Sequence, residues 1–183
     1  MTLPRAAALA ALLLTLGCKD DPYADDSSAT DDSSATDDTS ATDDTSQGEE
    51  QNIEGTWLSE GDNISPLFQS QFFNYTSITA TFNTDLSYDV DATDGDGAQY
   101  NFQGTYVVDT STEIPSIVLT QTVPNATTAE GIWQVEGSTL TYEVVQTQPN
   151  PAGFVAPTPE TGFGSTSGPG LVEGDNVQVY VKQ

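Results

Sequence analysis

From residue 51 onward the chain is built of short segments in which apolar and polar side chains alternate, and this pattern restricts the fold to β-sheet. The segment "SITATF" puts Ile78, Ala80 and Phe82 on one face and serine or threonine on the other. A period of two matches an extended strand, whose successive side chains point to opposite faces. The next segment, "LSYDVDA" at 86–92, alternates in the same way. The short link between the two predicts a hairpin.

Further strands are predicted at 53–59, 99–109, 116–123 and 176–182, and a second hairpin at 131–145. Short links between successive strands imply an antiparallel meander. About eight strands is the number at which such a sheet can close into a barrel. We therefore predict an all-β domain over 51–183 that forms a closed or nearly closed barrel. A β-sandwich is the alternative.

The first predicted strand carries Gly55-Thr56-Trp57, and a long link separates it from the meander that follows. This arrangement resembles the lipocalin-like (calycin) barrels, and the resemblance implies a cup that binds small apolar ligands. In the link, Ser65 could cap a short helix begun by Pro66, lying over the barrel mouth or plugging one end. Lipocalins usually place an arginine against the tryptophan. Here Lys182 is the available substitute.

Five aromatic side chains on the predicted strands are candidates for contact with a ligand: Trp57, Phe82, Tyr88, Tyr106 and Trp133. They could line a cup, or they could simply fill the core of a small barrel. The domain has 16 acidic residues and a single base. A cup with almost no cation available predicts a neutral ligand, such as a lipid, a sterol-like or an aromatic molecule.

The formal charge of the whole chain is -25, and it contains no histidine. Such acidity excludes direct binding to nucleic-acid phosphates and favours a monomer. Without histidine the usual general base and the commonest transition-metal ligand are missing. We therefore expect no catalytic residue and no cofactor. A hydrolase that depends on carboxylates alone is the least favoured alternative.

Two loops contain weaker candidates. Asp91, Asp94 and Asp96 lie among glycines between two predicted strands, but their spacing does not match an EF-hand, so an acidic hairpin loop is favoured over a Ca²⁺ site. The Pro/Gly-rich segment 149–170 contains Phe154 and Phe163. Loops of this length are usually functional or disordered. It could act as a lid or recognition loop, or merely cover an open barrel end.

The N-terminus has Arg5 followed by an apolar run at 6–16, which is too short to span a bilayer and typical of a secretory signal. Its ending, "TLGC", resembles a bacterial lipobox. The resemblance implies a signal peptide at 1–17 and a lipid attached to Cys18. We therefore expect the protein in the bacterial cell envelope, anchored to a membrane, with the outer membrane as first choice. The domain would lie in the periplasm or at the cell surface.

Residues 18–50 contain nearly four copies of an acidic hexapeptide, "DDSSAT" and its variants, and this repeat has no large apolar side chain. Such a segment cannot build a core, so we predict a disordered tether that like charges extend. The complete reading is an envelope lipoprotein whose barrel binds a small neutral apolar ligand. The alternative is a non-catalytic structural or adhesive surface module with a filled barrel.

Overall fold

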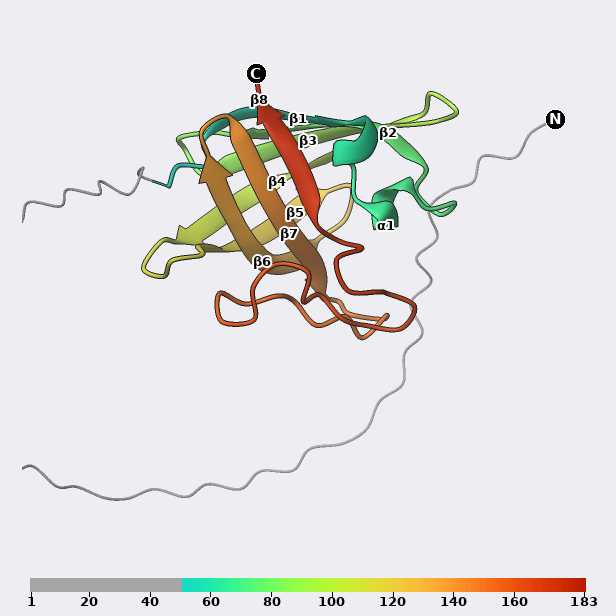
Figure 1. Ribbon diagram of the computed structural model, residues 1–183. Helices are drawn as coiled ribbons and strands as arrows, with labels where there is room; N and C mark the ends of the chain where they lie inside the picture. Colours follow the sequence, from blue (N-terminus) through green and yellow to red (C-terminus); the bar gives the residue numbers. More distant parts are fainter. Residues whose placement is uncertain (1–50) are drawn as a thin grey trace, which may run out of the picture. The chain divides into compact units, whose positions relative to one another are not determined.

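Eight antiparallel strands close into a single barrel in the computed structural model, which describes residues 51–183 (Figure 1). Each strand pairs with the next along the chain, and the last pairs with the first. The strands are β1 Gly55–Glu60, β2 Tyr75–Phe82, β3 Ser87–Asp94, β4 Gln99–Asp109, β5 Ser116–Val123, β6 Thr127–Glu136, β7 Thr139–Gln148 and β8 Gln178–Lys182. The predicted meander barrel is confirmed, and the sandwich is excluded. The predicted signal peptide, Cys18 and the tether lie outside the described residues.

The pairing of the strands follows the alternation in the sequence. In the hairpin of β6 and β7, Val135 lies opposite Leu140 and Trp133 opposite Tyr142, so all four side chains point to the same face of the sheet. The turn between them needs only two residues, and Gly137 takes a φ of 60°, which glycine adopts without steric cost. The predicted facing of these side chains is therefore confirmed.

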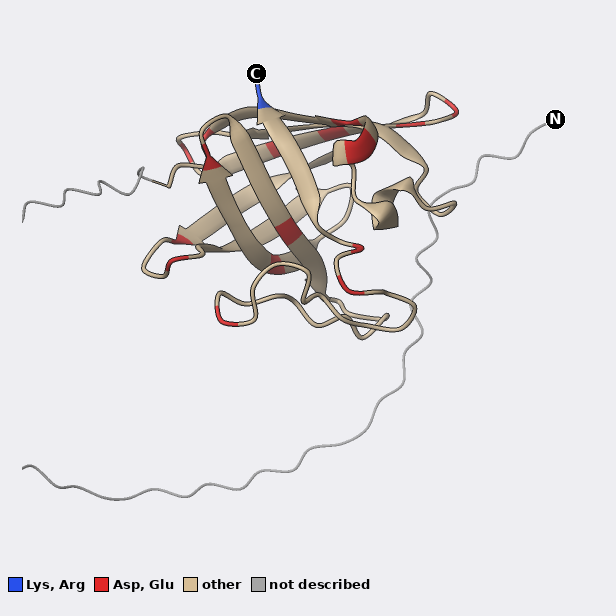
Figure 2. Cartoon of the chain, viewed as in Figure 1, with Lys and Arg blue, Asp and Glu red and all other residues tan. Residues whose placement is uncertain are grey.

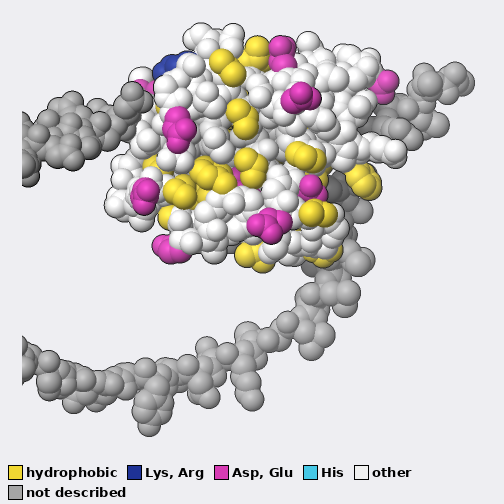
Figure 3. Space-filling model, in the orientation of Figure 1, with side chains coloured by type: hydrophobic (Ala, Val, Ile, Leu, Met, Phe, Trp, Pro, Cys, Tyr) yellow, Lys and Arg dark blue, Asp and Glu magenta, His cyan; other side chains and the backbone are white. Residues whose placement is uncertain are grey.

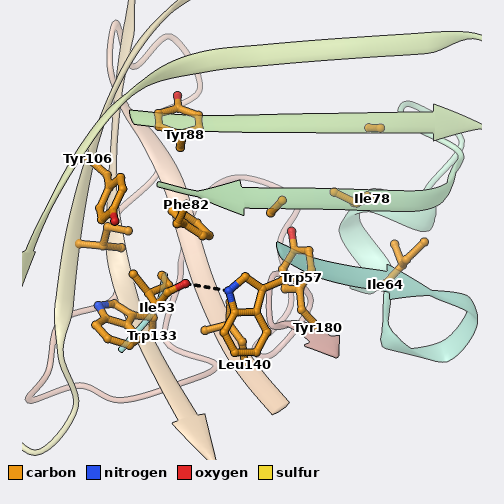
Figure 4. Close-up of a cluster of buried hydrophobic side chains, with 13 residues drawn as sticks. Ile53, Trp57, Ile64, Ile78, Phe82, Tyr88, Tyr106, Trp133, Leu140 and Tyr180 are labelled. Atoms are coloured by element: carbon orange, nitrogen blue, oxygen red, sulfur yellow. Dashed lines mark hydrogen bonds between the residues drawn. The ribbon is translucent and has the colours of Figure 1, made fainter. Parts of the chain in front are cut away.

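The barrel end at which β1 begins, here called the closed end, is plugged by residues 51–54. The indole Nε1 of Trp57 donates a hydrogen bond of 2.7 Å to the carbonyl oxygen of Ile53, whose side chain packs inside (Figure 4). The carboxamide of Gln51 pairs with both the N–H and the carbonyl of Val135, at 2.9 and 3.2 Å. This plug is why β1 begins at Gly55 and not at residue 53, as the pattern predicted.

Lys182 lies at the same end, across the barrel seam from β1. Its Nζ is 5.2 Å from the centroid of the Trp57 ring, and Trp57 and Lys182 are paired residues of β1 and β8. The expected contact between this lysine and the tryptophan is therefore present. Because Lys182 itself is exposed to solvent, such a cation–π contact is worth about 0.5–1 kcal/mol.

The opposite end, here called the α1 end, carries the long link between β1 and β2. This link forms a 3₁₀ turn, η1 (Gly61–Asn63), and a short helix, α1 (Pro66–Gln69). The hydroxyl of Ser65 accepts a hydrogen bond from the N–H of Phe68, so the predicted cap is confirmed. The N–H of Leu67 also donates to the carbonyl of Asp175, which ties α1 to the last loop.

The long loop between β7 and β8 is fixed to the outer face of β7. Glu143 points outward from that strand and is fully buried, because its carboxylate accepts hydrogen bonds from the N–H groups of Gly164 and Thr166, at 2.5 and 2.9 Å. Asn176 adds a bond to the carbonyl of Val144. Because the side chain of Asn176 is used in this way, β8 begins at Gln178, two residues later than predicted.

Acidic residues are scattered over strands and loops, while the single base of the described domain lies near the C-terminal tip (Figure 2). Acidic and hydrophobic side chains are interspersed on the face that carries β6, β7 and the last loop (Figure 3). A membrane-crossing helix would have to be longer and more apolar than any helix found between residues 51 and 183.

Candidate functional site in the barrel interior

The five aromatic candidates come together in one cluster inside the barrel, as Figure 4 shows. All five are buried: Trp57 and Trp133 have no exposed surface, and the other three are at most 5% exposed. Phe82 and Tyr106 stack edge to face, with ring centroids 5.2 Å apart. Trp57 and Trp133, with Leu140 and Ile53, pack the closed end. These side chains therefore form the packed part of the interior and leave little surface for a ligand.

Towards the α1 end the interior is different, because inward-facing side chains keep accessible surface. Six of them, here called the cup residues, point inward and are only partly buried: Val90, Tyr100, Phe102, Leu119, Tyr142 and Val144. In a closed barrel, the accessible surface of an inward side chain in the middle of a strand faces the barrel interior, where water can reach it. The cup residues therefore keep some accessible surface, although Ile78 and Ala92, which also point inward toward the α1 end, are almost fully buried.

The alternation in the sequence places the cup residues on the inner face, but it cannot distinguish them from the packed residues. Tyr88 and Val90 occupy equivalent inward positions on β3, yet Tyr88 is 5% exposed while Val90 keeps more surface. The difference depends on what the opposite wall of the barrel contributes. That information lies in strands distant in the sequence.

Three tyrosine hydroxyls face this interior without a hydrogen bond to the described protein: those of Tyr88, Tyr142 and Tyr180. Among the described side chains, the only polar atom that is both inaccessible and unpaired is Oγ of Ser70. Since the three hydroxyl oxygens are unpaired, they must keep some accessible surface. By contrast, the hydroxyl of Tyr106 donates to the carbonyl of Asn83, and that of Tyr100 to Asp94.

Burial keeps these tyrosines protonated. It raises the pKa of Tyr88 to about 12, and it also raises that of Tyr180. The pKa of Tyr142 is raised as well, first by burial and then by the neighbouring Tyr180 and Tyr88. The rings of Tyr142 and Tyr180 are in contact, with centroids 6.1 Å apart. At neutral pH each hydroxyl retains its proton and can donate it to an acceptor.

Two other inward polar side chains are already paired with each other. Nε2 of Gln178 donates to the hydroxyl of Ser59 at 2.6 Å, and its Oε1 accepts from the N–H of Ser65 at 2.8 Å. All three residues are buried. This network ties β8 to β1 and to the start of α1. It explains how a carboxamide can be buried in a small barrel without a ligand, because buried polar groups need partners.

Two pockets lie outside the cup. One, of about 210 Å³, is at the closed end and is lined by the plug together with Leu86, Tyr106, Val108 and Trp133. The other, of about 350 Å³, lies beside the β1–β2 link and is lined by mostly polar residues that include Asp62, Asn74 and Tyr75. The pocket at the closed end is lined mostly by apolar and aromatic side chains, Tyr106 and Trp133 among them, as is typical of sites for apolar small molecules, whereas the second is not.

The acidic candidates do not come together. Asp94 organises the β3–β4 turn, since its carboxylate accepts from the N–H groups of Asp96 and Ala98. These bonds, led by that from Ala98, lower the pKa of Asp94. Asp91 instead accepts from the side chain of Asn101. Within residues 51–183 there is no group of three acidic, histidine or cysteine side chains arranged to hold a metal ion.

Phe154 and Phe163, the candidates of the last loop, are both half-buried. The backbone of Phe154 is held by the side chain of Asn150, and its ring packs against Gly168. The bonds that fix this loop run to the outer face of β7, as described above for Glu143. Alternation along β7 places Glu143 on the outer face of the strand, but the sequence does not indicate that it is buried. Nothing local distinguishes Glu143 from its exposed neighbours.

Comparison with protein-family models, with curated proteins and with solved structures finds no match to this chain.

Proposed function

We propose that the protein is a membrane-anchored envelope lipoprotein whose barrel binds a small neutral apolar ligand in the α1 half of its interior. The observation that carries this proposal is the accessible surface of the cup residues. A barrel that served only as a packed scaffold would bury these inward aromatic and aliphatic side chains, because each buried apolar side chain stabilises a fold by about 1.5–3 kcal/mol.

The character of the cup favours a neutral ligand. The cup residues are four apolar side chains and two tyrosines, with no charged group among them. The one base of the domain, Lys182, lies over Trp57 at the closed end. An anionic ligand would therefore meet no opposite charge inside and 16 acidic residues around it. A ligand without charge avoids both costs.

The resemblance to lipocalin-like barrels supports the same assignment. The Gly55-Thr56-Trp57 strand begins at the plugged end, and the long link with α1 lies at the opposite end, where the cup residues keep their accessible surface. A mouth at the α1 end agrees with the expectation that the link lies over it. The membership of this family is part of the proposal.

One observation favours a second candidate, a non-catalytic surface module with a filled barrel. The closed half is packed with side chains that have almost no exposed surface, including Trp57, Trp133 and Leu140. If the cup holds only water, the domain would serve as a stable, highly acidic body at the end of a tether. No arrangement of groups in the described domain favours catalysis over these two functions.

Native mass spectrometry of the full-length mature protein, purified from the membranes of its source in mild detergent, decides between the two. We expect a discrete additional mass of a few hundred daltons that is lost on denaturation. A known apolar carrier, purified and sprayed in the same way, controls for loss of ligand. If the carrier keeps its ligand and the barrel carries none, the filled module becomes the better assignment.

The anchor is tested separately, since it depends on Cys18. The mature wild-type chain should begin at this cysteine and carry the mass of a diacylglyceryl group and an N-acyl chain. A single acyl chain holds a protein only marginally, whereas several hold it firmly. Cys18→Ser should remove the added mass and release the protein from the membrane fraction. An unmodified cysteine in the membrane-bound wild type contradicts the lipoprotein assignment.

A further inference from the structure

The cup has hydrogen-bond donors that the protein itself does not use. The hydroxyls of Tyr88, Tyr142 and Tyr180 have no protein partner among the described residues, and their oxygens keep some accessible surface, although Tyr88 and Tyr180 as whole residues are each 95% buried. Buried polar groups almost always have a partner, because leaving one unpaired costs about 1–3 kcal/mol. These hydroxyls therefore need an acceptor that is not part of the barrel, either water or a bound molecule.

Two of the tyrosines belong to one local arrangement. Tyr142 of β7 and Tyr180 of β8 pack edge to face, with ring centroids 6.1 Å apart. In the β7–β8 ladder, Tyr142 lies opposite Gln178 and Tyr180 lies opposite Leu140, so both tyrosines point inward. Phe82 contacts Tyr142 from the other side at 6.2 Å. The rings are held by packing, which fixes the directions from which their hydroxyls can donate.

The adjoining polar side chains do not complete this arrangement. Gln178 is the neighbour of both tyrosines along the inner wall, but its carboxamide is used by Ser59 and Ser65. The carboxylates nearest in the sequence, such as Glu143, point outward and are paired there. Inside the cup, the tyrosine hydroxyls thus meet neither an anion nor a free carboxamide.

We propose that the ligand of the cup carries an uncharged oxygen acceptor, such as the carbonyl of a ketone, ester or quinone, which accepts hydrogen bonds from Tyr142 and Tyr180. Tyr88 supplies a further hydroxyl on the side of β3. This inference rests on the proposed function, because it specifies the ligand of the same cup. It assigns the apolar body of the ligand to the cup residues and its polar group to the tyrosines.

Two probes of nearly equal shape test the assignment: 2-acetylnaphthalene, which has a ketone, and 2-ethylnaphthalene, which has none. Their affinities for the full-length protein are measured by calorimetric titration in the same detergent buffer. The quantity of interest is the ratio of the two dissociation constants, since the shared naphthalene and the detergent affect both probes alike. Tyr142→Phe and Tyr180→Phe each remove one hydroxyl and no other atom.

We expect each variant to shift that ratio against the ketone by about three- to tenfold, as for loss of one hydrogen bond. Binding of 2-ethylnaphthalene should remain unchanged. Tyr106→Phe is the matched control, because its hydroxyl is already bonded to Asn83 at the closed end and should leave the ratio as it is. Neither Tyr142→Phe nor Tyr180→Phe removes a hydrogen bond within the described protein, so both variants should fold. Circular dichroism checks this.

The two proposals fail in different ways. If both naphthalenes bind but neither Tyr142→Phe nor Tyr180→Phe changes the ratio, the hydroxyls are satisfied by water and the acceptor assignment is overturned alone. If neither naphthalene binds to the wild type at its solubility limit, the cup does not accept apolar molecules of this size. The proposed function then falls together with the inference.

Discussion

A single carboxylate, that of Glu143, fixes the position of the long loop. It is fully buried on the outer face of β7, and two backbone N–H groups of the loop donate to it. Burying a carboxylate is costly unless hydrogen bonds compensate, and bonds to a charged acceptor are about twice as strong as neutral ones. Glu143 thus supplies hydrogen-bond acceptors for the loop backbone, as paired strands do for each other in the barrel.

Replacing Glu143 with Gln should destabilise the protein by about 2–4 kcal/mol, because an amide donor then faces an N–H group of the loop. Urea unfolding measures this loss, and limited proteolysis should show earlier cleavage between residues 149 and 177. Glu130→Gln is the control: Glu130 is exposed, lies on the outer face of β6 and accepts only from Thr147. Equal effects of the two substitutions would mean that Glu143 does not hold the loop.

The buried tyrosines predict a loss of stability at high pH. Burial raises the pKa of Tyr75 and Tyr88 from 10 to about 12 in the folded protein. Above pH 10 the unfolded chain releases these protons while the folded chain retains them, so the contribution of these tyrosines to the free energy of unfolding should be constant below pH 10 and fall between pH 10 and 12. Absorbance at 295 nm follows the ionisation. Tyr88→Phe should make the fall shallower, and an unchanged slope would contradict the raised pKa.

At the scale of the element, the β6–β7 hairpin depends on one close approach of backbones. A Cβ on Gly131 would overlap the carbonyl oxygen of Glu143 on the paired strand. Gly131→Ala should therefore cost about 3 kcal/mol, at the upper end of the range for overpacking. Gly137→Asn, in the turn of the same hairpin, is the control. Nothing lies near its Cβ position and asparagine tolerates a positive φ, so we expect a change below about 0.5 kcal/mol.

The measurement for this pair of variants is urea unfolding of the full chain with a common slope. A cost for Gly131→Ala no larger than that for Gly137→Asn would mean that the strands separate easily at this point. The packing of β6 against β7 would then be looser than the geometry indicates.

The strands themselves could be predicted closely from the sequence. β4 and β5 have the predicted bounds, because their alternating patterns end at clear turns. The starts of β1 and β8 could not be predicted, since the plug at 51–54 and the side chain of Asn176 are held by residues far along the chain, Val135 and Val144. Alternation along the strands was enough to place the five aromatic candidates on the inner face. It could not single out the cup residues, because their exposure depends on strands that are distant in the sequence.

For the whole molecule, charge is the dominant feature. The described domain has 16 acidic residues and one base, so repulsion between carboxylates opposes the compact state. Salt screens such repulsion, with a Debye length near 10 Å at 0.1 M and 3 Å at 1 M. The melting temperature should therefore rise steeply from low to molar NaCl, as differential scanning calorimetry can show. A flat response would mean that the carboxylates are too far apart to destabilise the fold.

The seam of the barrel is narrow, because the backbone ladder between β8 and β1 has only two paired positions, Trp57 with Lys182 and Leu58 with Val181. These pairs join the first strand to the last. Contacts between distant parts of a chain form slowly. The cylinder can therefore close only after residue 182 has been synthesised, and the preceding seven strands remain an open sheet until then.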